Sequence, residues 1–383
     1  MKIIYLANVR VPTENAHGLQ IAKMCEALAQ IEAEVILLVP RRNNHIKADI
    51  FSYYSLEKNF KIETLPTFDL NDFGRVGFWL QNFFFSLVSF FYCLSHPNFD
   101  LIYSRDELPL LFVSFLTKKT IWEIHINRYN FLTRILTSKV SAIVAISGGL
   151  KKFLEESGVN LQKILVCPDA VDLSIFDRLP KDKKILREKL GLLPGRLLVT
   201  YVGKYTTMNQ DKGVDDLIKA FTFVHRKLPL SQLLLVGIQN TVIERLKNIL
   251  VAEGISENDY CIITHKPHDV AMQYVKTGDV LIMNYPNIGH YTLYMSPLKL
   301  FEYMASGNPI VSTSLPSIRE ILSSDEAYLI EPNNIESLVN SIVYALNNPE
   351  ESNKKARLAL DLVRKKYTWE SRAKNILRFF KDF

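Results

Sequence analysis

Cysteine is scarce in this sequence, and the few cysteines stand far apart. The 383 residues include only Cys25, Cys93, Cys167 and Cys261, with no CxxC pair and no cluster of cysteine with histidine. A disulfide framework needs several closely spaced cysteines, and a structural zinc site needs short ligand spacings. The sequence therefore argues against both kinds of scaffold and is typical of a chain in a reducing compartment.

The common phosphate-binding fingerprints are also missing. No GxGxxG follows the first apolar run, KIIYLA, so the sequence lacks the nicotinamide or flavin signature. The stretch YVGKYTT resembles a Walker loop only superficially, because Tyr205 follows Lys204 and no glycine stands five residues before Gly203. A P-loop is excluded.

Charge is absent from Val76 to Phe99, where the middle of the segment reads FWLQNFFFSLVSFFYCL. The length permits a membrane span, but amides and serines interrupt it and its many aromatic rings favour an interface. Three interpretations stay open: a buried helix, an amphipathic helix partly dipped into a bilayer, or a true span. A basic rim for the second interpretation could come from Arg41, Arg42, Lys118, Lys119, Arg128, Arg134, Lys139, Lys151 and Lys152, although each pair alone is typical of a solvated face.

Length and composition describe a folded protein of two domains. The chain is too long for one ordinary core, and its 48% hydrophobic and 22% charged residues are those of a globular protein. A net charge of +6 and a pI near 8.9 favour anionic partners, such as nucleotide phosphates, an acidic substrate or a membrane surface. The opening run MKIIYLANVRVP is too short for a signal peptide and predicts a first strand.

Strands and helices alternate along the chain. Short apolar runs end where polar residues begin, and a helix is predicted between the first two, which indicates parallel sheets whose ligands bind beyond the carboxyl ends of the strands. The predicted strands cover residues 2–7, 34–40, 100–106, 119–125 and 142–147, and then 196–203, 231–237, 259–265, 279–285 and 309–313. The pattern restarts after a charged segment, Lys181 to Lys189, which is the predicted linker. The fold class is therefore α/β, with two doubly wound Rossmann-like domains facing a central cleft.

The stretch SPLKLFEYMASGNPIV places one carboxylate inside an apolar helix. Ser296 is the predicted N-cap, with Pro297 at the first helical position and Gly307 as the stop. Glu302 lies near the apolar face, where an unpaired charge would cost several kcal/mol, roughly. It is either part of an ion pair or an acceptor for the hydroxyl groups of a ligand.

Two lysines beside glycines form a predicted anion site. Gly203 and Lys204 stand at the end of a strand, and Lys212 and Gly213 stand at the start of the next helix. A strand end, a helix N-terminus and two cations are suited to a diphosphate. Each lysine alone would be typical of a solvated surface.

Over essentially its full length, the chain resembles a retaining GT-B glycosyltransferase of family 4, the group 1 type. The segments that carry the resemblance are YVGKYTTMNQDKGVDDLIKAF, PDAVDLSIF, AISGGLKKFL, SPLKLFEYMASGNPIVSTSLPSIREIL and KYTWESRAKNIL. The resemblance implies an acceptor-side domain over residues 1–178 and a nucleotide-sugar-binding domain over 179–365. It also implies that a C-terminal helix, 366–383, packs back on the N-terminal domain.

The resemblance also assigns roles within the donor site. Lys204 and Lys212 match the two cations that hold the donor diphosphate, although lysine at 204 loses the bidentate fork of the usual arginine. Glu302 matches the second glutamate of an E-x7-E motif and is implied to bind the ribose. Tyr294 replaces the first glutamate, which leaves the identity of the donor sugar open. The full set of expected donor-binding residues is Gly18, Gly203, Tyr294, Ser296, Leu298 and Glu302.

On the N-terminal side, ENAHG resembles the family's glycine-containing loop, where Gly18 would let the backbone approach a phosphate. His125, in WEIHI, matches a histidine that approaches the donor sugar near the acceptor; otherwise it is a satisfied histidine at a strand end. His17 is expected to be only a loop residue. The predicted catalytic residues are therefore His125, Lys204 and Lys212.

The resemblance implies transfer of a sugar from a nucleotide-sugar to a glycan or polyprenyl-linked acceptor, with retention, in polysaccharide or glycoconjugate biosynthesis. No DxD cluster is present, and Asp215 and Asp216 suit the first turn of a helix, so no essential metal and no other cofactor is expected. The expected location is cytoplasmic, with peripheral contact to the inner membrane face and no nucleic acid. Two alternatives remain: a sugar-nucleotide epimerase on the same scaffold, and a non-catalytic sugar-nucleotide-binding protein.

Overall fold

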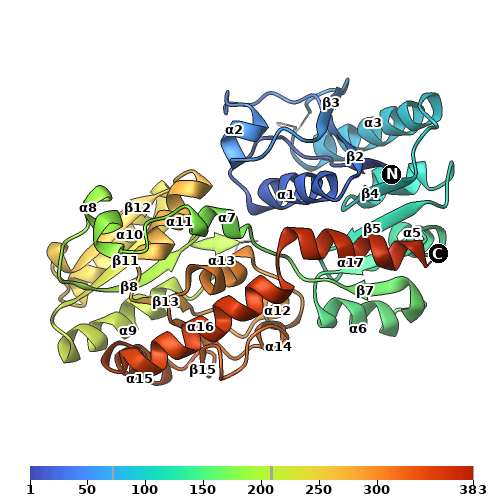
Figure 1. Ribbon diagram of the computed structural model, residues 1–383. Coiled ribbons are helices and arrows are strands. Elements are labelled where there is room, and N and C mark those ends of the chain that lie inside the picture. Colours follow the sequence, from blue (N-terminus) through green and yellow to red (C-terminus); the bar gives the residue numbers. More distant parts are fainter. Residues whose placement is uncertain (71–72, 208–209, 383) are drawn as a thin grey trace. The chain divides into compact units, whose positions relative to one another are not determined.

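The computed structural model describes residues 1–70, 73–207 and 210–382. The chain forms two compact units, one of Met1–Asp169 with Trp369–Phe383 and the other of Ala170–Thr368 (Figure 1). Each unit has a parallel sheet with helices on both faces, as expected for a Rossmann-like domain.

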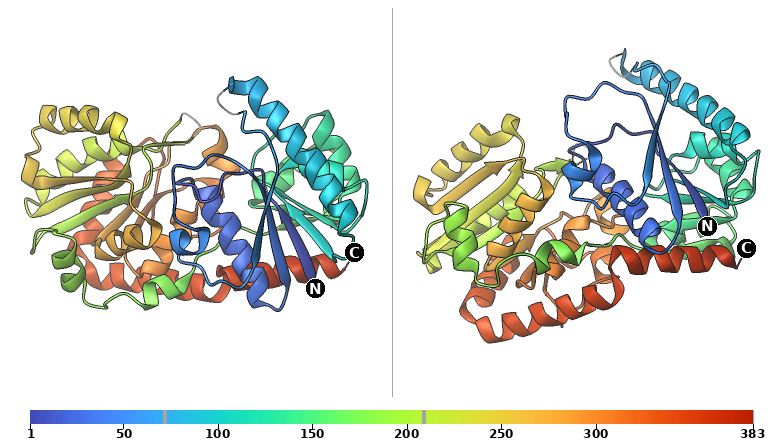
Figure 2. Two further views of the ribbon diagram at one scale, coloured as in Figure 1. Left: turned by 90° about the horizontal axis from the view of Figure 1, so that it is seen from above. Right: turned by 45° about the horizontal axis from the view of Figure 1, so that its top comes forward.

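The first unit is built on seven parallel strands in the order β3-β2-β1-β4-β5-β6-β7. These are β1 (Lys2–Leu6), β2 (Glu34–Pro40), β3 (Lys61–Leu65), β4 (Leu101–Ser104), β5 (Thr120–Ile124), β6 (Ala142–Ala145) and β7 (Ile164–Val166). The helices are α1 (Ala16–Gln30), α2 (Ile50–Tyr54), α3 (Gly74–Ser95), α4 (Glu107–Val113), α5 (Phe131–Lys139), α6 (Gly148–Glu156) and α17 (Trp369–Lys381). α1 and α17 cover one face of the sheet, and α3, α4 and α5 cover the other (Figure 2).

The second unit has six parallel strands in the order β12-β11-β8-β13-β14-β15. These are β8 (Leu197–Val202), β11 (Ser231–Ile238), β12 (Tyr260–Thr264), β13 (Val280–Met283), β14 (Ile310–Thr313) and β15 (Tyr328–Ile330), and β9 (Thr206–Thr207) pairs with β10 (Gln210–Asp211) as a separate ribbon. The helices are α7 (Leu173–Asp177), α8 (Lys183–Lys189), α9 (Val214–Lys227), α10 (Asn240–Ala252), α11 (His268–Thr277), α12 (Gly289–Leu293), α13 (Leu298–Ser306), α14 (Pro316–Arg319), α15 (Ile335–Asn347) and α16 (Pro349–Lys366). Two apolar clusters, one on each face of the sheet, form the core.

The sequence explains why these elements form. The central strands are runs of valine, isoleucine and leucine that are buried on both faces, as parallel strands require. α9 follows a glycine in the left-handed conformation, carries Asp215 and Asp216 in its first turn and ends with basic residues, which suits the helix dipole.

In both sheets the strand order reverses next to the first strand of the unit. The chain moves outward from β1 through β2 to β3 and then returns to β4 on the other side of β1, and β8 and β13 are related in the same way. The loops that follow two such neighbouring strands run to opposite faces of the sheet and leave a crevice between them. Ligands bind in this crevice, beyond the carboxyl ends of the two strands. The strand order therefore gives each unit one candidate position for a site.

The predicted strands are confirmed, and the fold class of two doubly wound α/β domains is correct. Strands β3, β7 and β15, which lie at the edges of the sheets, are not among the predicted strands. β7 and β15 have only three residues each, and β3 reads KIETL, in which polar and apolar residues mix. Such short edge strands carry too little hydrophobic pattern to be recognised.

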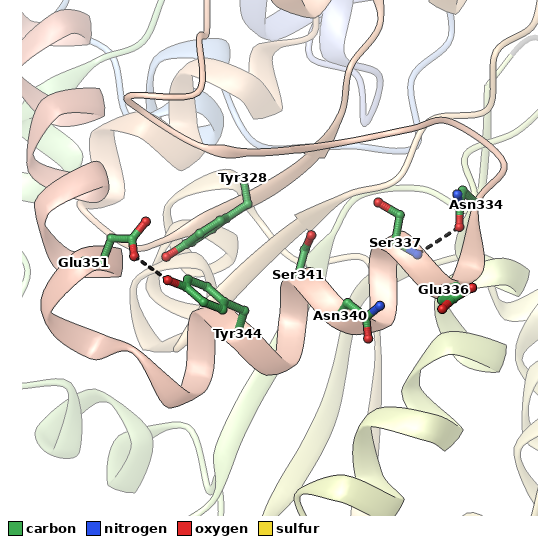
Figure 3. A pocket seen from close by; sticks show the side chains of 8 residues that line it. All are labelled: Tyr328, Asn334, Glu336, Ser337, Asn340, Ser341, Tyr344 and Glu351. Atoms are coloured by element: carbon green, nitrogen blue, oxygen red, sulfur yellow. Dashed lines mark hydrogen bonds between the residues drawn. The ribbon is translucent and has the colours of Figure 1, made fainter.

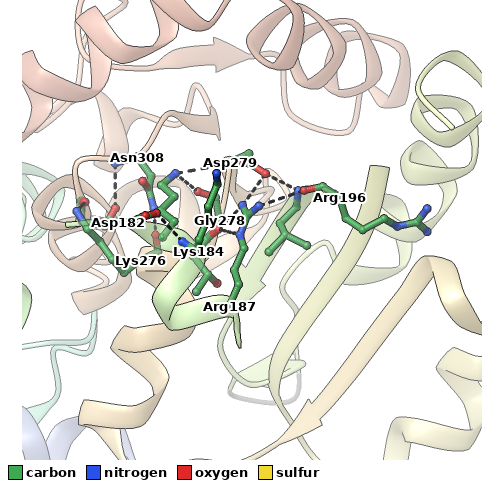
Figure 4. A network of polar contacts seen from close by, with 12 residues as sticks. Asp182, Lys184, Arg187, Arg196, Lys276, Gly278, Asp279 and Asn308 are labelled. Atoms are coloured by element: carbon green, nitrogen blue, oxygen red, sulfur yellow. Dashed lines mark hydrogen bonds and ion pairs between the residues drawn. The ribbon is translucent and has the colours of Figure 1, made fainter. Parts of the chain in front are cut away.

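The predicted linker between Lys181 and Lys189 is wrong, because most of it is helix α8 of the second unit. Arg187 donates to the carbonyl of Thr277 and pairs with Asp279 at 2.7 Å, and Lys183 donates to the carbonyl of Gly278 at 2.6 Å (Figure 4). The basic side chains thus fix α8 to the C-terminal end of α11.

The units divide after Asp169 and after Thr368, whereas the sequence suggests residues 178 and 365. Val171, Ile175 and Phe176 lie in an apolar cluster of the second unit, which is why the division falls before them. After Thr368, helix α17 returns to the first unit and packs beside α1 and β6.

Arg372 fixes α17 to the first unit. It is 2% exposed, pairs with Glu123 of β5 at 3.1 Å, and donates to the carbonyl of Pro168 at 2.8 Å. A buried guanidinium held by a carboxylate and carbonyl groups has compensated charge, so the end of the chain is part of the core of this unit.

The interpretation of residues 76–99 as a fully buried helix is wrong. The buried side of α3 carries small or polar residues for the most part, including Gly77, Gln81, Ser86 and Ser89. Its outer side carries large apolar residues, and 45–71% of each is exposed: Val76, Phe78, Trp79, Leu80, Phe83, Phe91 and Leu94. By length and composition, α3 could also cross a membrane, although one face packs on α4 and β3.

We expect Arg372→Met to destabilise the first unit by about 3–5 kcal/mol, because Glu123 would keep a buried charge without its main partner. Urea unfolding followed by circular dichroism measures this loss. Arg378→Met, at an exposed position of the same helix, is the control and should change the free energy of unfolding by about 0.5 kcal/mol or less. A loss below about 1 kcal/mol for Arg372→Met would show that this ion pair does not hold α17 in place.

Candidate functional site

The reversal of strand order in the second unit brings together the ends of β8 and β13. Gly203 follows β8 with φ 149°, and Asn284 follows β13. Gly213, the N-cap of α9, lies so close to Asn284 that a Cβ at this position would be 1.7 Å from its carbonyl oxygen. Glycine is therefore required at 213, and the start of α9 is packed against the end of β13.

The two predicted lysines, Lys204 and Lys212, lie between β8 and α9. Burial, together with the charge of Lys204, lowers the pKa of Lys212 to about 8. Lys204 and Lys212 are thus close enough to repel each other, which is the arrangement expected of a site that binds an anion. The full motif that contains them spans residues 208–209, which lie outside the described residues.

The predicted contribution of the α9 N-terminus needs a correction. The backbone N–H of Gly213 donates to the carboxylate of Asp211 at 2.6 Å, so at least one N–H group at this helix start already has an acceptor. Burial raises the pKa of Asp211, and the Gly213 N–H group opposes that shift. In the proposed anion site, the lysine side chains therefore contribute more to anion binding than the N–H groups at the start of α9.

A third lysine, which the sequence pattern did not indicate, lies beside the end of β8. Lys299, on α13, is 8% exposed, and its Nζ lies 3.7 Å from the centre of the Tyr201 ring at the end of β8. The available signal was a lysine at the second position of an otherwise apolar helix. Helical periodicity alone did not show that it reaches Gly203.

Glu302 lies one turn of α13 after Lys299 and has a partner. Its Oε1 is 2.7 Å from Nε2 of His268, the first residue of α11. Its other oxygen, Oε2, makes no hydrogen bond within the described part of the chain. The ion-pair interpretation and the ligand interpretation are therefore compatible, because Oε1 is bound by His268 while Oε2 can accept hydrogen bonds from the hydroxyl groups of a ligand.

The residues before α13 depart from the prediction in two details. The helix begins at Leu298 with Pro297 as its N-cap, so Ser296 is not the cap. The N–H of Tyr294 donates to the carbonyl of His290 at 3.0 Å and is not available for a phosphate. Leu298 is half-buried in the first turn, and the predicted stop at Gly307 is confirmed by its left-handed φ of 68°.

In the first unit, His125 follows β5 and contacts Glu123. The His125 Nε2 lies 2.6 Å from Glu123 Oε1, which also accepts from Gln20 at 2.7 Å. Glu123 Oε2 accepts from the hydroxyl of Tyr103 and pairs with Arg372. His125 is therefore part of a buried polar network rather than an isolated strand end.

This network fixes the protonation of His125. Burial would raise the pKa of Glu123, but Arg372, His125 and Arg105 hold it well below its ordinary value. Burial and Arg105 lower the pKa of His125 to about 4. The ionised Glu123 carboxylate can only accept hydrogen bonds. Nε2 therefore carries the proton of the neutral imidazole, and Nδ1 is left as a hydrogen-bond acceptor.

Gly18 lies in the first turn of α1 and not in a loop, which corrects the sequence prediction. A Cβ at this position would be 2.3 Å from the Tyr54 hydroxyl and 2.4 Å from Cγ2 of Thr13. The same hydroxyl accepts from the N–H of Thr13 at 2.8 Å and donates to its carbonyl. Packing against Tyr54 is thus sufficient to require glycine, independently of any ligand.

The reversal point of the first sheet holds a polar group that the sequence analysis did not identify. The N–H of Asn8 donates to Asp106 at 2.6 Å, and Arg42 donates to the side-chain oxygens of Asn8 at 2.7 Å and Gln81 at 2.6 Å. Arg42 therefore belongs to this group and not to a basic rim. Because Gln81 comes from α3, the polar side of that helix faces the position where a ligand of the first unit would bind.

A separate pocket of about 570 Å³ lies beside β15 and α15 (Figure 3). It is lined by Tyr328, Asn334, Glu336, Ser337, Asn340, Ser341, Tyr344 and Glu351. None of these residues comes from the loops after β8 or β13, so we place the candidate site at the reversal point and not here. Within the described ranges, no group of three or more His, Cys, Asp or Glu side chains could hold a metal ion.

Residues 196–348 match the family described as Glycosyl transferases group 1. The match is confined to this part of the chain. It runs from β8 to α15 and includes Lys204, Lys212 and Glu302. The matched residues thus cover most of the unit in which the sequence predicted the nucleotide-sugar site.

The whole chain also resembles known glycosyltransferases. An uncharacterized glycosyltransferase of Methanocaldococcus jannaschii is 21% identical over 358 residues, covering 88% of this chain and 85% of its own. The capsular polysaccharide biosynthesis glycosyltransferase CapM of Staphylococcus aureus is 24% identical over 212 residues, covering 54% of this chain and 52% of its own. The crystal structure of Anabaena HepE in complex with UDP and glucose superposes with a TM-score of 0.73, at 17% identity and 100% coverage of both chains. The chain therefore has the GT-B fold.

We expect His125 to remain neutral until the pH approaches 4, in contrast to an ordinary histidine with a pKa near 6.5. The folded state then binds fewer protons than the unfolded state between these values, so acidification from pH 6.5 to 4 removes about 3 kcal/mol of stability. Comparison of wild type with His125→Gln by urea unfolding isolates this effect from that of Asp169, whose pKa burial raises to about 6. An NMR titration of the imidazole with a midpoint near 6.5 would contradict the assignment.

Proposed function

We propose that this protein is a retaining glycosyltransferase of family 4 that moves a sugar from a nucleotide-sugar to an acceptor. The observation that carries the proposal is the set of Lys204, Lys212 and Glu302 beside the reversal point of a group 1 domain. Lysines suit the diphosphate, and a carboxylate with one free oxygen suits the hydroxyl groups of a ribose. HepE, which has the same fold, was crystallised with UDP, which supports a nucleotide-sugar as the donor.

The chemistry follows from these groups. When the sugar leaves, negative charge develops on the β-phosphate, and Lys204 and Lys212 stabilise it where it forms. His125 offers Nδ1 as an acceptor for a hydroxyl proton on the acceptor side, held in orientation by Glu123. The lysines neutralise the leaving diphosphate, so the proposal needs no essential metal and no cofactor beyond the donor.

The acceptor in this proposal is a glycan or polyprenyl-linked sugar at the inner face of the membrane. CapM supports a role in polysaccharide biosynthesis. The outer face of α3 supports the membrane location, because a helix with its large apolar side chains outward and its polar side chains inward is the reverse of a solvated surface helix. Aromatic side chains are those preferred at a membrane surface.

Basic residues accompany the exposed aromatic face. Phe115, which follows α4, is 62% exposed, and the Nζ of Lys139 lies 4.9 Å from the centre of its ring. Lys118 and Lys119, between α4 and β5, and Arg134 of α5 are also exposed, and α4 packs on both α3 and α5. Apolar rings with lysines and arginine between them favour an anionic lipid surface as the partner.

We expect the full chain to release a nucleoside diphosphate from one of UDP-, GDP-, ADP- or dTDP-sugars in the presence of a membrane extract that supplies the acceptor. Lys212→Ala should lower kcat/KM on the order of 100- to 1,000-fold, because a charge that stabilises the leaving group is lost. Lys219→Ala, on the exposed side of α9, is the control and should match wild type.

The products separate the alternatives. Wild-type turnover in Lys212→Ala would refute the cationic site, and an altered free sugar formed without acceptor would identify an epimerase. Binding of a nucleotide-sugar without any turnover would identify a non-catalytic binding protein.

We expect wild type to sediment with vesicles that contain 30% phosphatidylglycerol. The double variant Trp79→Ser, Phe83→Ser should bind these vesicles at least tenfold more weakly, because it lacks two aromatic rings that would be buried in the bilayer surface. Phe223→Ser removes a similarly exposed ring from the second unit and should bind like wild type. Unchanged binding of the double variant would exclude α3 as the membrane contact. A dimer without lipid that dissociates in this variant would show instead that α3 pairs two copies.

A further inference from the structure

Lys299 is buried without a hydrogen-bond partner. The residue is 8% exposed, and its Nζ has no acceptor among the described residues. Burial of an amine without hydrogen-bond acceptors costs free energy. If this position served only to fill space in the core, an apolar side chain would be more stable there. The position is therefore suited to a ligand that brings its own acceptors.

The amine of Lys299 lies at the end of β8. Its Nζ is 3.7 Å from the centre of the Tyr201 ring and 5.5 Å from that of Tyr285. A Cβ on Gly203 would be only 2.9 Å from Nζ, so the absence of a side chain at 203 makes room for the lysine. Lys299 thus reaches the same strand end from which Lys204 follows.

The charged and titratable groups around Lys299 do not neutralise it. Tyr201, Tyr285 and Tyr303 are neutral and buried, and the Tyr303 hydroxyl accepts from the N–H of Val202 at 2.8 Å. Glu302 is the nearby carboxylate, but its Oε1 is held by His268. Lys212 adds a like charge, and Lys204 adds another beside it.

We propose that Lys299 is a third cation of the donor site and binds an anionic oxygen of the nucleotide-sugar's diphosphate. This inference rests on the proposed function, and it adds a residue that the E-x7-E motif does not include. Its position beside Gly203, where the charge of Lys212 also acts on it, favours the phosphates over a carboxylate on the donor sugar, which is the other source of an anionic oxygen. In the sequence, Lys299 stands five residues after Tyr294, the residue that replaces the usual first glutamate.

Binding of the diphosphate should then take up protons. Burial, followed by the charge of Lys212, lowers the pKa of Lys299 far below its ordinary value, and Glu302 only partly opposes this. A bound dianion favours the ammonium form, so ligand binding raises the pKa of Lys299. At pH 7 Lys212, with a pKa of about 8, is already mostly charged and contributes little to this uptake.

The test is isothermal titration of the full chain at pH 7 with UDP, GDP, ADP and dTDP and with inorganic pyrophosphate. We expect Lys299→Met to raise the Kd of the best nucleoside diphosphate and of pyrophosphate at least tenfold, and to leave that of the corresponding nucleoside unchanged. In buffers of different ionisation enthalpy, the variant should take up less proton per bound ligand than wild type. Lys276→Met is the matched control, because Lys276 bonds the carbonyl of Ser306 at the other end of α13.

The melting temperature of the ligand-free protein separates binding from structure. Lys299→Met should melt at or above wild type, because a buried amine without acceptors is replaced by an apolar chain of similar length. A lower melting temperature, or an unchanged Kd for every diphosphate, would overturn the inference. If Lys299→Met weakens binding only of a nucleotide-linked uronic acid and leaves the Kd of every diphosphate unchanged, Lys299 binds a sugar carboxylate. That result would also overturn the inference.

The failure of this inference differs from that of the proposed function. If Lys212→Ala weakens diphosphate binding and Lys299→Met does not, the donor site stands and only its third cation is refuted. If wild type binds none of the four nucleoside diphosphates and no pyrophosphate, both are refuted.

Discussion

The reversal of strand order within each parallel sheet is the constraint on which the rest of the structure depends. Parallel strands must be joined by crossovers, and when two crossovers leave neighbouring strands in opposite directions, their loops separate beyond the strand ends. In the second unit this places Gly203 and Lys204 on one side and Asn284 on the other, with α9 and α13 closing around them. In the first unit the same geometry collects Asn8, Arg42 and Asp106, and orients the polar side of α3 toward them.

The two units differ in how they treat buried charge. Around Glu123, each charge has a partner. The carboxylate pairs with the guanidinium of Arg372 and accepts hydrogen bonds from the imidazole of His125 and from the hydroxyl of Tyr103. Such a network gives a fixed orientation to His125 and ties the end of the chain into the core. Around Lys299, Lys212 adds a like charge, the nearby carboxylate of Glu302 is bound by His268, and the amine has no acceptor among the described residues. A satisfied network positions a side chain, whereas an unsatisfied one is ready to bind.

Helix α3 shows how the two requirements of the first unit combine. Its inner side supplies Gln81 to the polar group at the reversal point and is otherwise lined mostly by small buried residues such as Gly77 and Ser89. Its large apolar side chains are therefore left on the outside. An interpretation from composition alone could not choose between burial and exposure, because only the packing decides which stripe of the helix faces inward.

The sequence by itself determined the alternation of strands and helices, the two Rossmann-like domains and the pairing of Lys204 with Lys212, since these depend on local periodicity and on short loops. It also determined the stop of α13 at Gly307, where the left-handed backbone favours glycine. Only the tertiary structure decided that His268 holds Glu302, that Arg372 returns to Glu123, that Tyr54 requires glycine at 18, and that Lys299 reaches Gly203. These contacts join segments far apart in the chain, and their geometry is set by how the helices pack on each sheet, which no local pattern of residues records.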